Sequence, residues 1–208
     1  QLLLSGGWHK EGTVFPGKQA DNKASIHLNL THISENKKFR TTISASYVAE
    51  TNRELTVDLA STAISLPPDA PAIYDSNGNL NWENSTWTNP FSVLQKKYLG
   101  ETRNLIANTV LSYQILPRLQ LKTSLGYTSM QINETSLTPI TSFNPAGTYK
   151  QGSTILANNS IQTWIIEPQA QYQQKIAEGM LNILVGTTFQ QDITSGNTIQ
   201  GRGYTSDA

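Results

Sequence analysis

The chain has 208 residues, with 15 lysines and arginines against 15 aspartates and glutamates, and a pI near 7.0. This balance excludes the basic footprint of a nucleic-acid-binding protein, so no nucleic acid is expected as a partner. The absence of cysteine excludes disulfide frameworks, thiol nucleophiles and cysteine-based zinc sites. No apolar run approaches the roughly 20 residues of a transmembrane helix, so any membrane span would have to consist of β-strands.

The first segments already read as strands. The opening "QLLLSGGWHKEG" looks like a strand, and the chain is therefore expected to begin inside a larger protein. Apolar and polar residues then alternate over 26–31 and 39–47, on either side of the short turn "ENKK". A period of two residues indicates a strand with two different faces, so the two segments predict a hairpin.

Two further hairpins follow. Leu105 to Gln131 alternates on both sides of Pro117, which sets φ for a tight reversal and cannot donate to a ladder. Segments 164–173 and 181–190 alternate around the turn "KIAEG". The pattern predicts that one face carries Leu111, Leu125, Ile166, Ile183 and Val185, and the other carries Asn108, Ser112, Ser124, Gln169 and Asn182.

Short and long connections alternate along the chain. The turns within the hairpins are short, whereas Glu11 to Lys23, Thr51 to Thr102 and Gln131 to Ser160 are long and rich in Asn, Ser, Thr, Gly and Pro. Short turns at one end of an antiparallel sheet and long loops at the other are typical of an outer-membrane β-barrel. The expected strands, about seven, are also long enough to cross a bilayer obliquely. The tyrosines near apolar strand ends are candidates for interfacial girdles: Tyr47, Tyr113, Tyr127 and Tyr172.

A soluble, carbohydrate-binding β-sandwich is the alternative, because its strands alternate with the same period. The polar face favours the barrel, since Asn, Gln, Ser and Thr dominate it. Charged residues make up only 14% of the chain, whereas about 25% is usual for a globular protein. Periodicity alone leaves both architectures open.

A family resemblance adds to this pattern. The stretches "ISLPPDAPAIYDSNGNLNW", "NPF", "NLIANTVLSYQILPRLQLKTSLGYTSMQ" and "QTWIIEPQAQYQQKIAEGMLNILVGTTFQ" resemble the barrel of SusC/RagA-type TonB-dependent outer-membrane transporters. The resemblance implies an all-β antiparallel meander of long strands, an open segment of a 22-stranded transmembrane β-barrel with long extracellular loops. Residues 1–208 would then be part of the barrel, with the signal peptide, plug and remaining strands absent.

The resemblance also implies a function, a location and partners. It implies an active transporter in the outer membrane of a Gram-negative bacterium, importing bulky nutrients such as glycans or oligopeptides. The implied partners are outer-membrane lipid, a SusD-like lipoprotein, the TonB complex through the absent plug region, and a glycan or peptide substrate. Lipid would surround the outside of the hairpins, and the plug would fill the inside.

The long connection from Thr51 to Thr102 holds the candidate contact residues for a ligand or a partner: Tyr74, Trp82, Trp87 and Phe91. These aromatic side chains lie among Asn and Asp, a mixture that stacks on sugars and bonds hydroxyl groups, although anchoring of the folded loop is the more ordinary role. "DSNGN" fits an Asn-Gly turn better than a calcium loop, because its glycine is misplaced for an EF-hand.

No catalytic residues, cofactor or metal are expected. The histidines His9, His27 and His32 are scattered, without metal-ligand spacing or a neighbouring carboxylate motif. The sequence contains no triad, phosphate-binding glycine loop or isolated acid pair, so it does not predict an enzyme. Two further expectations concern the sheet: its outermost strands, near Leu2 to His9 and Met180 to Gln191, are unpaired on one side, and arginine at Leu125 or Ile183 impairs barrel assembly.

Overall fold

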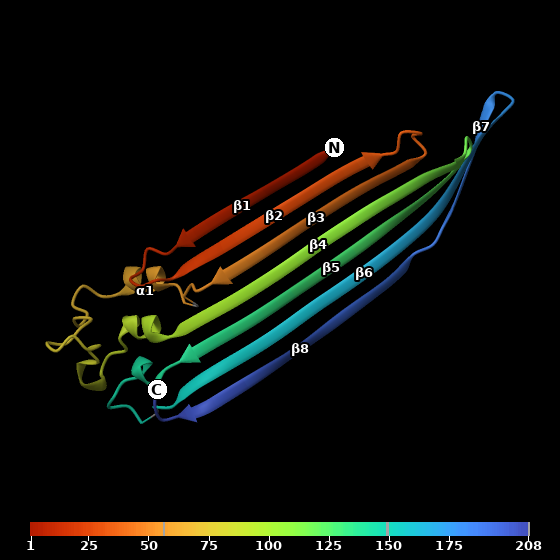
Figure 1. Cartoon of the computed structure of the whole chain (residues 1–208). Coiled ribbons are helices and arrows are strands. Elements are labelled where there is room, and N and C mark those ends of the chain that lie inside the picture. The colour runs from red at the N-terminus through yellow and green to blue at the C-terminus, as the bar shows by residue number, and fades with distance from the viewer. Residues whose placement is uncertain (56, 149, 208) are drawn as a thin grey trace.

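The computed structural model of the chain describes residues 1–55, 57–148 and 150–207. These residues form one antiparallel sheet whose strands follow one another in chain order (Figure 1). The strands are β1 (Leu2–Gly12), β2 (Ala20–Ile33), β3 (Phe39–Asn52), β4 (Lys97–Leu116), β5 (Leu119–Thr138), β6 (Gly152–Ile176), β7 (Gly179–Gly186) and β8 (Phe189–Tyr204). The expected antiparallel meander is confirmed.

The eighth strand continues the seventh. Both β7 and β8 pair with β6 in the same register from Ser153 to Ile176, in which Gln169 lies opposite Gly186 and Ile166 lies opposite Phe189. Between these pairs Pro168 accepts a hydrogen bond from the backbone N–H of Thr187 at 3.1 Å, but has no N–H to return. The missing donor interrupts the ladder of hydrogen bonds along β6. The segment that was expected to be the seventh strand is therefore divided into two, β7 and β8, and the sheet has eight strands.

The predicted faces are confirmed by the register. Residues directly opposite each other in an antiparallel ladder share a face. Leu111 pairs with Thr123, Leu125 pairs with Ile166, and the alternation along β5 places all of them on one side. We call the side that carries Leu125 the first face and the side that carries Ser124 the second face. The first face also holds Ile183 and Val185, and the second holds Asn108, Ser112, Gln169 and Asn182.

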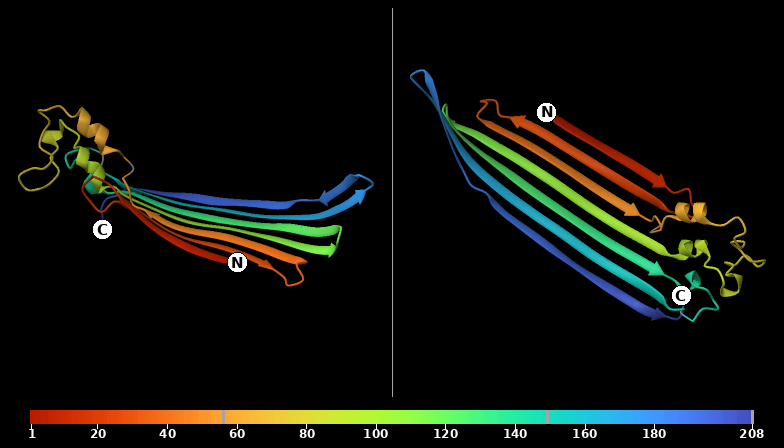
Figure 2. Two further views of the ribbon diagram at one scale, coloured as in Figure 1. Left: turned by 90° about the horizontal axis from the view of Figure 1, so that it is seen from above. Right: turned by 180° about the vertical axis from the view of Figure 1, so that it is seen from behind.

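All short turns lie at one end of the sheet and all long connections at the other (Figure 2). The long connections are shorter than expected, because the strands extend to leave only 13–19, 53–96 and 139–151 outside them. The added strand segments, such as 132–138 and 153–159, carry polar residues on both faces and so lose the alternating signal. Their backbones still pair completely, as Thr138 opposite Ser153 shows.

The helices lie in the long connections and not in the sheet. They are α1 (Leu59–Ser65) and the short 3-10 helices η1 (Glu83–Ser85), η2 (Pro90–Gln95) and η3 (Ile140–Ser142). Among the described residues, no helix is long and apolar enough to cross a membrane. Asp58 caps α1 by accepting a 2.8 Å hydrogen bond from the N–H of Ala60.

The sheet is a single layer. Leu59, which lies in α1, is the one buried hydrophobic residue among those that the structure describes. A β-sandwich buries the inner faces of two packed sheets, so the sandwich alternative does not fit this architecture. Within the described residues the two edges are free as predicted, since β1 pairs only with β2, and β7 and β8 pair only with β6.

Candidate functional site

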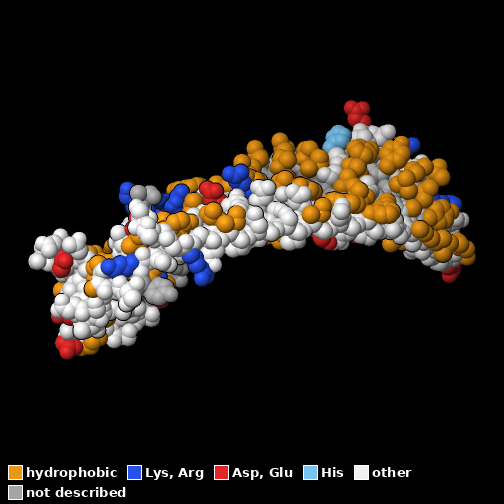
Figure 3. Space-filling model, turned by 90° about the horizontal axis from the view of Figure 1, so that it is seen from below, with side chains coloured by type: hydrophobic (Ala, Val, Ile, Leu, Met, Phe, Trp, Pro, Cys, Tyr) orange, Lys and Arg blue, Asp and Glu red, His pale blue; other side chains and the backbone are white. Residues whose placement is uncertain are grey.

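The first face carries an apolar band in the half of the sheet nearest the short turns. Hydrophobic side chains gather there on the convex side of the molecule, whereas the long-loop end is mostly uncharged and polar (Figure 3). Many of these side chains are exposed although they are large, as Trp8 at 70% and Val185 at 65% illustrate. An exposed apolar surface of this extent marks a region that another apolar phase or partner covers.

Aromatic side chains border the band on both sides. The border towards the long loops carries Trp8, Tyr47, Tyr127 and Trp164, and the border towards the turns carries Phe39, Tyr113 and Tyr172. The predicted girdle tyrosines therefore divide between two rows. Trp8, Phe39 and Trp164 were missed, although their place in the alternating pattern was available in the sequence. Tyrosine and tryptophan combine an apolar ring with a polar group, which suits them to a membrane interface.

The spacing of the two rows fits a bilayer. Tyr47 and Phe39 lie eight residues apart on β3, and Trp164 and Tyr172 lie eight residues apart on β6. At about 3.3 Å per residue this is ~26 Å along each strand. Strands tilted by about 40° reduce it to ~20 Å of height, and with the rings themselves the band approaches the ~25 Å apolar belt of outer-membrane barrels.

Both rows step towards the turns along the sheet, the loop-side row from β1 to β6 and the turn-side row from β3 to β6. Trp8 on β1 lies in the same register row as Ser160 on β6, and Trp164 lies four residues further towards the turns. Four residues correspond to ~13 Å along the strand, and five strand spacings to ~24 Å across the sheet. The rows are therefore inclined by ~30° from the perpendicular to the strands, and strands tilted by about that angle, near the tilt expected of barrel strands, would bring the rows level in a membrane.

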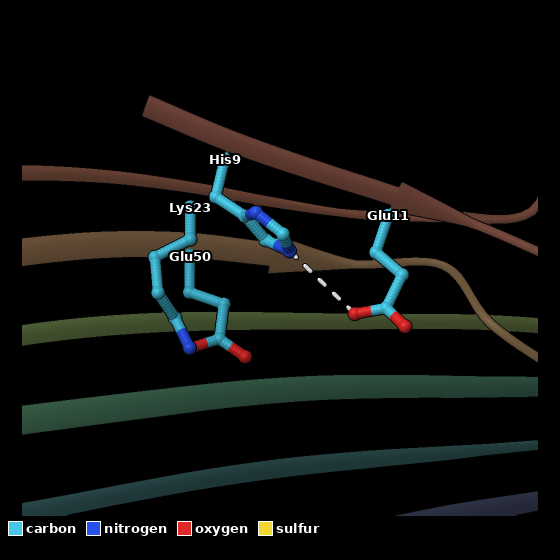
Figure 4. Close-up of polar contacts among 4 residues, drawn as sticks. All are labelled: His9, Glu11, Lys23 and Glu50. Carbon is cyan, nitrogen blue, oxygen red and sulfur yellow. Dashed lines mark ion pairs between the residues drawn. The ribbon is translucent and has the colours of Figure 1, made fainter. Parts of the chain in front are cut away.

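The second face is polar, and its ion pairs lie near the long-loop end. His9, Lys23 and Glu50 occupy one register row across β1, β2 and β3 (Figure 4). Lys23 Nζ lies 2.9 Å from Glu50 Oε2, and His9 Nε2 lies 3.5 Å from Glu11 Oε2. Across the described ranges, no three histidine or acidic side chains are grouped so as to hold a metal ion.

A buried asparagine organises the long connection between β3 and β4. Asn89 is fully buried, and its Nδ2 donates to the carbonyl oxygens of Ile73 at 2.6 Å and Asn81 at 2.9 Å. Its Oδ1 accepts from the N–H of Phe91 at 2.9 Å and caps η2. One side chain thus joins three parts of this loop. The "NPF" motif was noticed in the sequence, but this role of its asparagine was not predicted.

"DSNGN" is a turn, as the sequence favoured. Asp75 Oδ1 accepts hydrogen bonds from the backbone N–H groups of Asn77 and Asn79, both at 2.9 Å, and Gly78 adopts a φ of 80°. The hydrogen bond from the Asn79 N–H is the main cause that lowers the pKa of Asp75, with smaller contributions from Asn77 and Gly78; burial opposes it. The Asp75 carboxylate therefore stabilises the turn by accepting its backbone hydrogen bonds.

The turn forms one wall of a loop cavity of about 670 Å³. Tyr74 and Trp82 line this cavity; Phe91 does not line it but packs edge-on against Tyr74, with ring centroids 6.2 Å apart. Trp87 lies outside it. The structure thus brings together two of the four candidate residues and places a third behind them. Contact of any of the four with a ligand or partner stays a prediction.

The opposite wall comes from the connection between β5 and β6. It contributes Ile140, Phe143 and Lys150, which sequence reasoning did not select. Asn144 Nδ2 donates to Ser85 Oγ at 2.9 Å and joins this connection to the longer one. The sequence signal for Phe143 was the stretch "FNP", which contains the same three residue types as the "NPF" of the longer loop.

The tail after β8 holds the same connection. Asp207 accepts backbone hydrogen bonds from Ile140 at 2.6 Å and Thr141 at 3.1 Å, at the start of η3. The hydrogen bond from Ile140 is the main cause of a lowered pKa at Asp207, although burial opposes it. Both walls of the cavity are therefore fixed by hydrogen bonds that join segments far apart in the chain.

Comparison with known proteins gives structural matches. No family model matches the sequence, and no curated protein matches it. The structure of the RagAB peptide transporter matches 99% of this chain with a TM-score of 0.75 at 16% sequence identity. Structures of the RagAB peptide importer in its closed-closed and open-open states match 91% of the chain, with TM-scores of 0.68 and 0.69 at 17% identity.

The chain spans about a quarter of the length of these transporter chains, with 24% of the first covered and 22% of the other two. At sequence identities this low the structural matches establish a shared fold alone, and this shared fold extends over nearly all of the present chain. The chain therefore has the fold of a segment of a RagAB transporter chain, and its resemblance to SusC/RagA-type transporters is confirmed at the level of fold.

Proposed function

We propose that residues 1–208 are part of the β-barrel of a TonB-dependent active transporter in the outer membrane of a Gram-negative bacterium. The carrying observation is the apolar band on the first face, bordered by two slanted rows of aromatic residues. Its height, slope and exposure fit lipid, whereas the second face fits a wet interior that a plug occupies. The fold shared with RagAB chains supports the same proposal.

The free edges support membership of a larger barrel. Hydrocarbon offers no partner to unpaired backbone groups, and each such group costs several kcal/mol in lipid. In the membrane, β1 and the line of β7 and β8 therefore pair with strands contributed by the rest of the protein. On this proposal the chain alone neither closes into a pore nor transports.

The cargo we propose is a bulky nutrient, either a glycan or an oligopeptide. The long connections then face the outside of the cell, where they meet a SusD-like lipoprotein and border the substrate path. The loop cavity, with Tyr74 and Trp82 on one wall and Phe143 on the other, supports this assignment because aromatic rings stack on sugar and peptide groups alike. Energy comes from the TonB complex through the plug region.

The test uses the full-length protein in its native cell envelope. We expect it to fractionate with the outer membrane, to require detergent for purification and to migrate differently in gels before and after heating. Uptake of labelled oligopeptides or oligosaccharides by the cells is expected to stop when TonB is deleted. A protein that purifies as a monomer without detergent would overturn the membrane assignment, and TonB-independent uptake would overturn the energy source.

A further inference from the structure

The first face carries a second surface beyond the aromatic border, on the side of the long loops. Here a hollow of about 400 Å³ crosses β5, β6 and β8. The first-face side chains that line it are all amides and hydroxyls: Gln131, Asn133, Asn158, Ser160, Ser195 and Asn197. We propose that this hollow binds the sugars of a glycolipid in the outer leaflet of the membrane. The proposal rests on the proposed function, because it requires the apolar band to lie in lipid.

The height of the hollow above the aromatic border fits the sugars of a glycolipid. Gln131 lies four residues beyond Tyr127, and Ser160 lies four residues beyond Trp164. Four residues correspond to ~13 Å along a strand and, at a tilt of about 40°, to ~10 Å of height. Interfacial aromatic rings lie at the level of the headgroups. A surface ~10 Å further out lies beyond the lipid phosphates, at the level reached by an oligosaccharide headgroup.

The lack of charge in the hollow also favours a sugar over a phosphate group. None of its six first-face side chains is charged, and the flanking positions on β4 carry one charge of each sign, Arg103 opposite Gln131 and Glu101 opposite Asn133. Recognition of a phosphate relies on lysine or arginine. Amides and hydroxyls both donate and accept, which matches the hydroxyl groups of a sugar.

Hydrogen-bonding capacity remains free in the hollow. Asn158 Nδ2 donates to Asn197 Oδ1 at 3.2 Å, and the hydroxyls of Ser160 and Ser195 lie 2.8 Å apart. Within the described part of the chain, the side chains of Gln131 and Asn133 make no hydrogen bond. The pairs fix the shape of the hollow, and the free groups remain available to a ligand.

The test measures glycolipid binding to the full-length transporter in detergent. The probes are purified lipopolysaccharide with its complete core oligosaccharide and lipid A without core sugars. We expect the unmodified protein to bind the first about tenfold more tightly, which corresponds to about 1.4 kcal/mol. The triple variant Asn133→Leu, Asn158→Leu and Asn197→Leu is expected to lose this preference and to bind lipid A as before.

The matched control is Asn29→Leu, Asn108→Leu and Asn182→Leu, which removes three amides from the second face and is expected to keep the preference. Free core oligosaccharide should displace the lipopolysaccharide from the unmodified protein, a measurement that does not depend on the folding of any variant. Raised salt should leave the preference unchanged, because no charge carries it.

Equal binding of the two glycolipids by the unmodified protein would overturn the proposal, and so would a preference that survives in the first triple variant or disappears in high salt. These results would leave the membrane assignment intact, provided that the protein still requires detergent and changes its gel mobility on heating. A protein that is soluble without detergent would overturn both proposals together.

Discussion

Leu125→Arg tests the orientation of the sheet in the membrane. Leu125 lies two residues inside the aromatic border at Tyr127 and pairs with Ile166. On the proposed orientation its side chain therefore enters lipid between that border and the middle of the band. An arginine on the lipid face at the midplane costs roughly 2–4 kcal/mol, and less towards the interfaces. We expect a loss of about 2 kcal/mol for this position.

Ile183→Arg provides a second depth. The sequence suggested a position near the midplane, but Ile183 lies opposite Tyr172, in the aromatic row at the turn-side border. A long cationic side chain there reaches the interface, and the expected cost falls to about 0–1 kcal/mol. The sequence led us to expect that both variants impair barrel assembly. With Ile183 at the border, we now expect this of Leu125→Arg alone.

The control is Ser124→Arg, the neighbouring residue on the second face. Its register partner on β6 is Glu167, so the introduced guanidinium gains a carboxylate on the same side. Each variant is made in the full-length protein, and urea unfolding in detergent micelles, followed by the heat-dependent gel shift, gives the change in free energy. If Ser124→Arg destabilises the protein as much as Leu125→Arg, the assignment of the first face to lipid is refuted.

Three other predictions concern the long loops. Asn89→Ala removes three hydrogen bonds from a fully buried side chain; limited proteolysis should cut residues 71–96 at least tenfold faster while the heat-dependent gel shift of the barrel stays unchanged. Because the pKa of Asp75 is lowered in the folded state, its contribution to the turn is complete above the ordinary aspartate pKa and disappears as pH falls through the folded value. Amide hydrogen exchange of the turn should accelerate over that acid range in the unmodified protein, but Asp75→Asn should show no such pH dependence. Trp82→Ala should weaken binding of the transported nutrient about tenfold whereas Trp87→Ala, outside the cavity, should not, and equal effects in an uptake assay would remove the cavity from the substrate path.

The half of the sheet that carries the apolar band was predictable from the sequence, and the half nearest the long loops was only partly so. Where lipid meets one face and water the other, residues must alternate, and Leu121, Thr123 and Leu125 carry that signal. Beyond the aromatic border both faces of a strand meet water, so "INETSLT" from Ile132 to Thr138 pairs fully without alternating. The loop connections were consequently expected to be longer than they are.

The loop cavity was predictable only on one side. Aromatic residues among Asn and Asp indicated Tyr74 and Trp82, because side-chain chemistry is visible in a sequence. Phe143 reaches the same cavity because the β4–β5 hairpin returns the chain to the same end of the sheet and Asn144 bonds Ser85. Pairing between segments about 60 residues apart depends on the sheet register, which single-sequence patterns do not supply.

The proline in β6 has a consequence for how the barrel is put together. Pro168 lies in the same register row as Thr123, which is four residues from Tyr127 and four from Leu119, and so at the middle of the apolar band that we propose lies in lipid. There the carbonyl of Thr187 lies opposite a residue that has no N–H to donate, and on the proposed function no water is present at that depth to replace it. The outermost pairing of β6 is therefore divided into two separate segments, of 8 residues in β7 and 16 residues in β8. The β7 segment adjoins the tight turn at Ala177 and Glu178, and we expect it to pair first, since little chain entropy is lost in closing such a short loop. We expect the edge to open most readily at Thr187, between the two segments, and an incoming strand to have most freedom there to find its register.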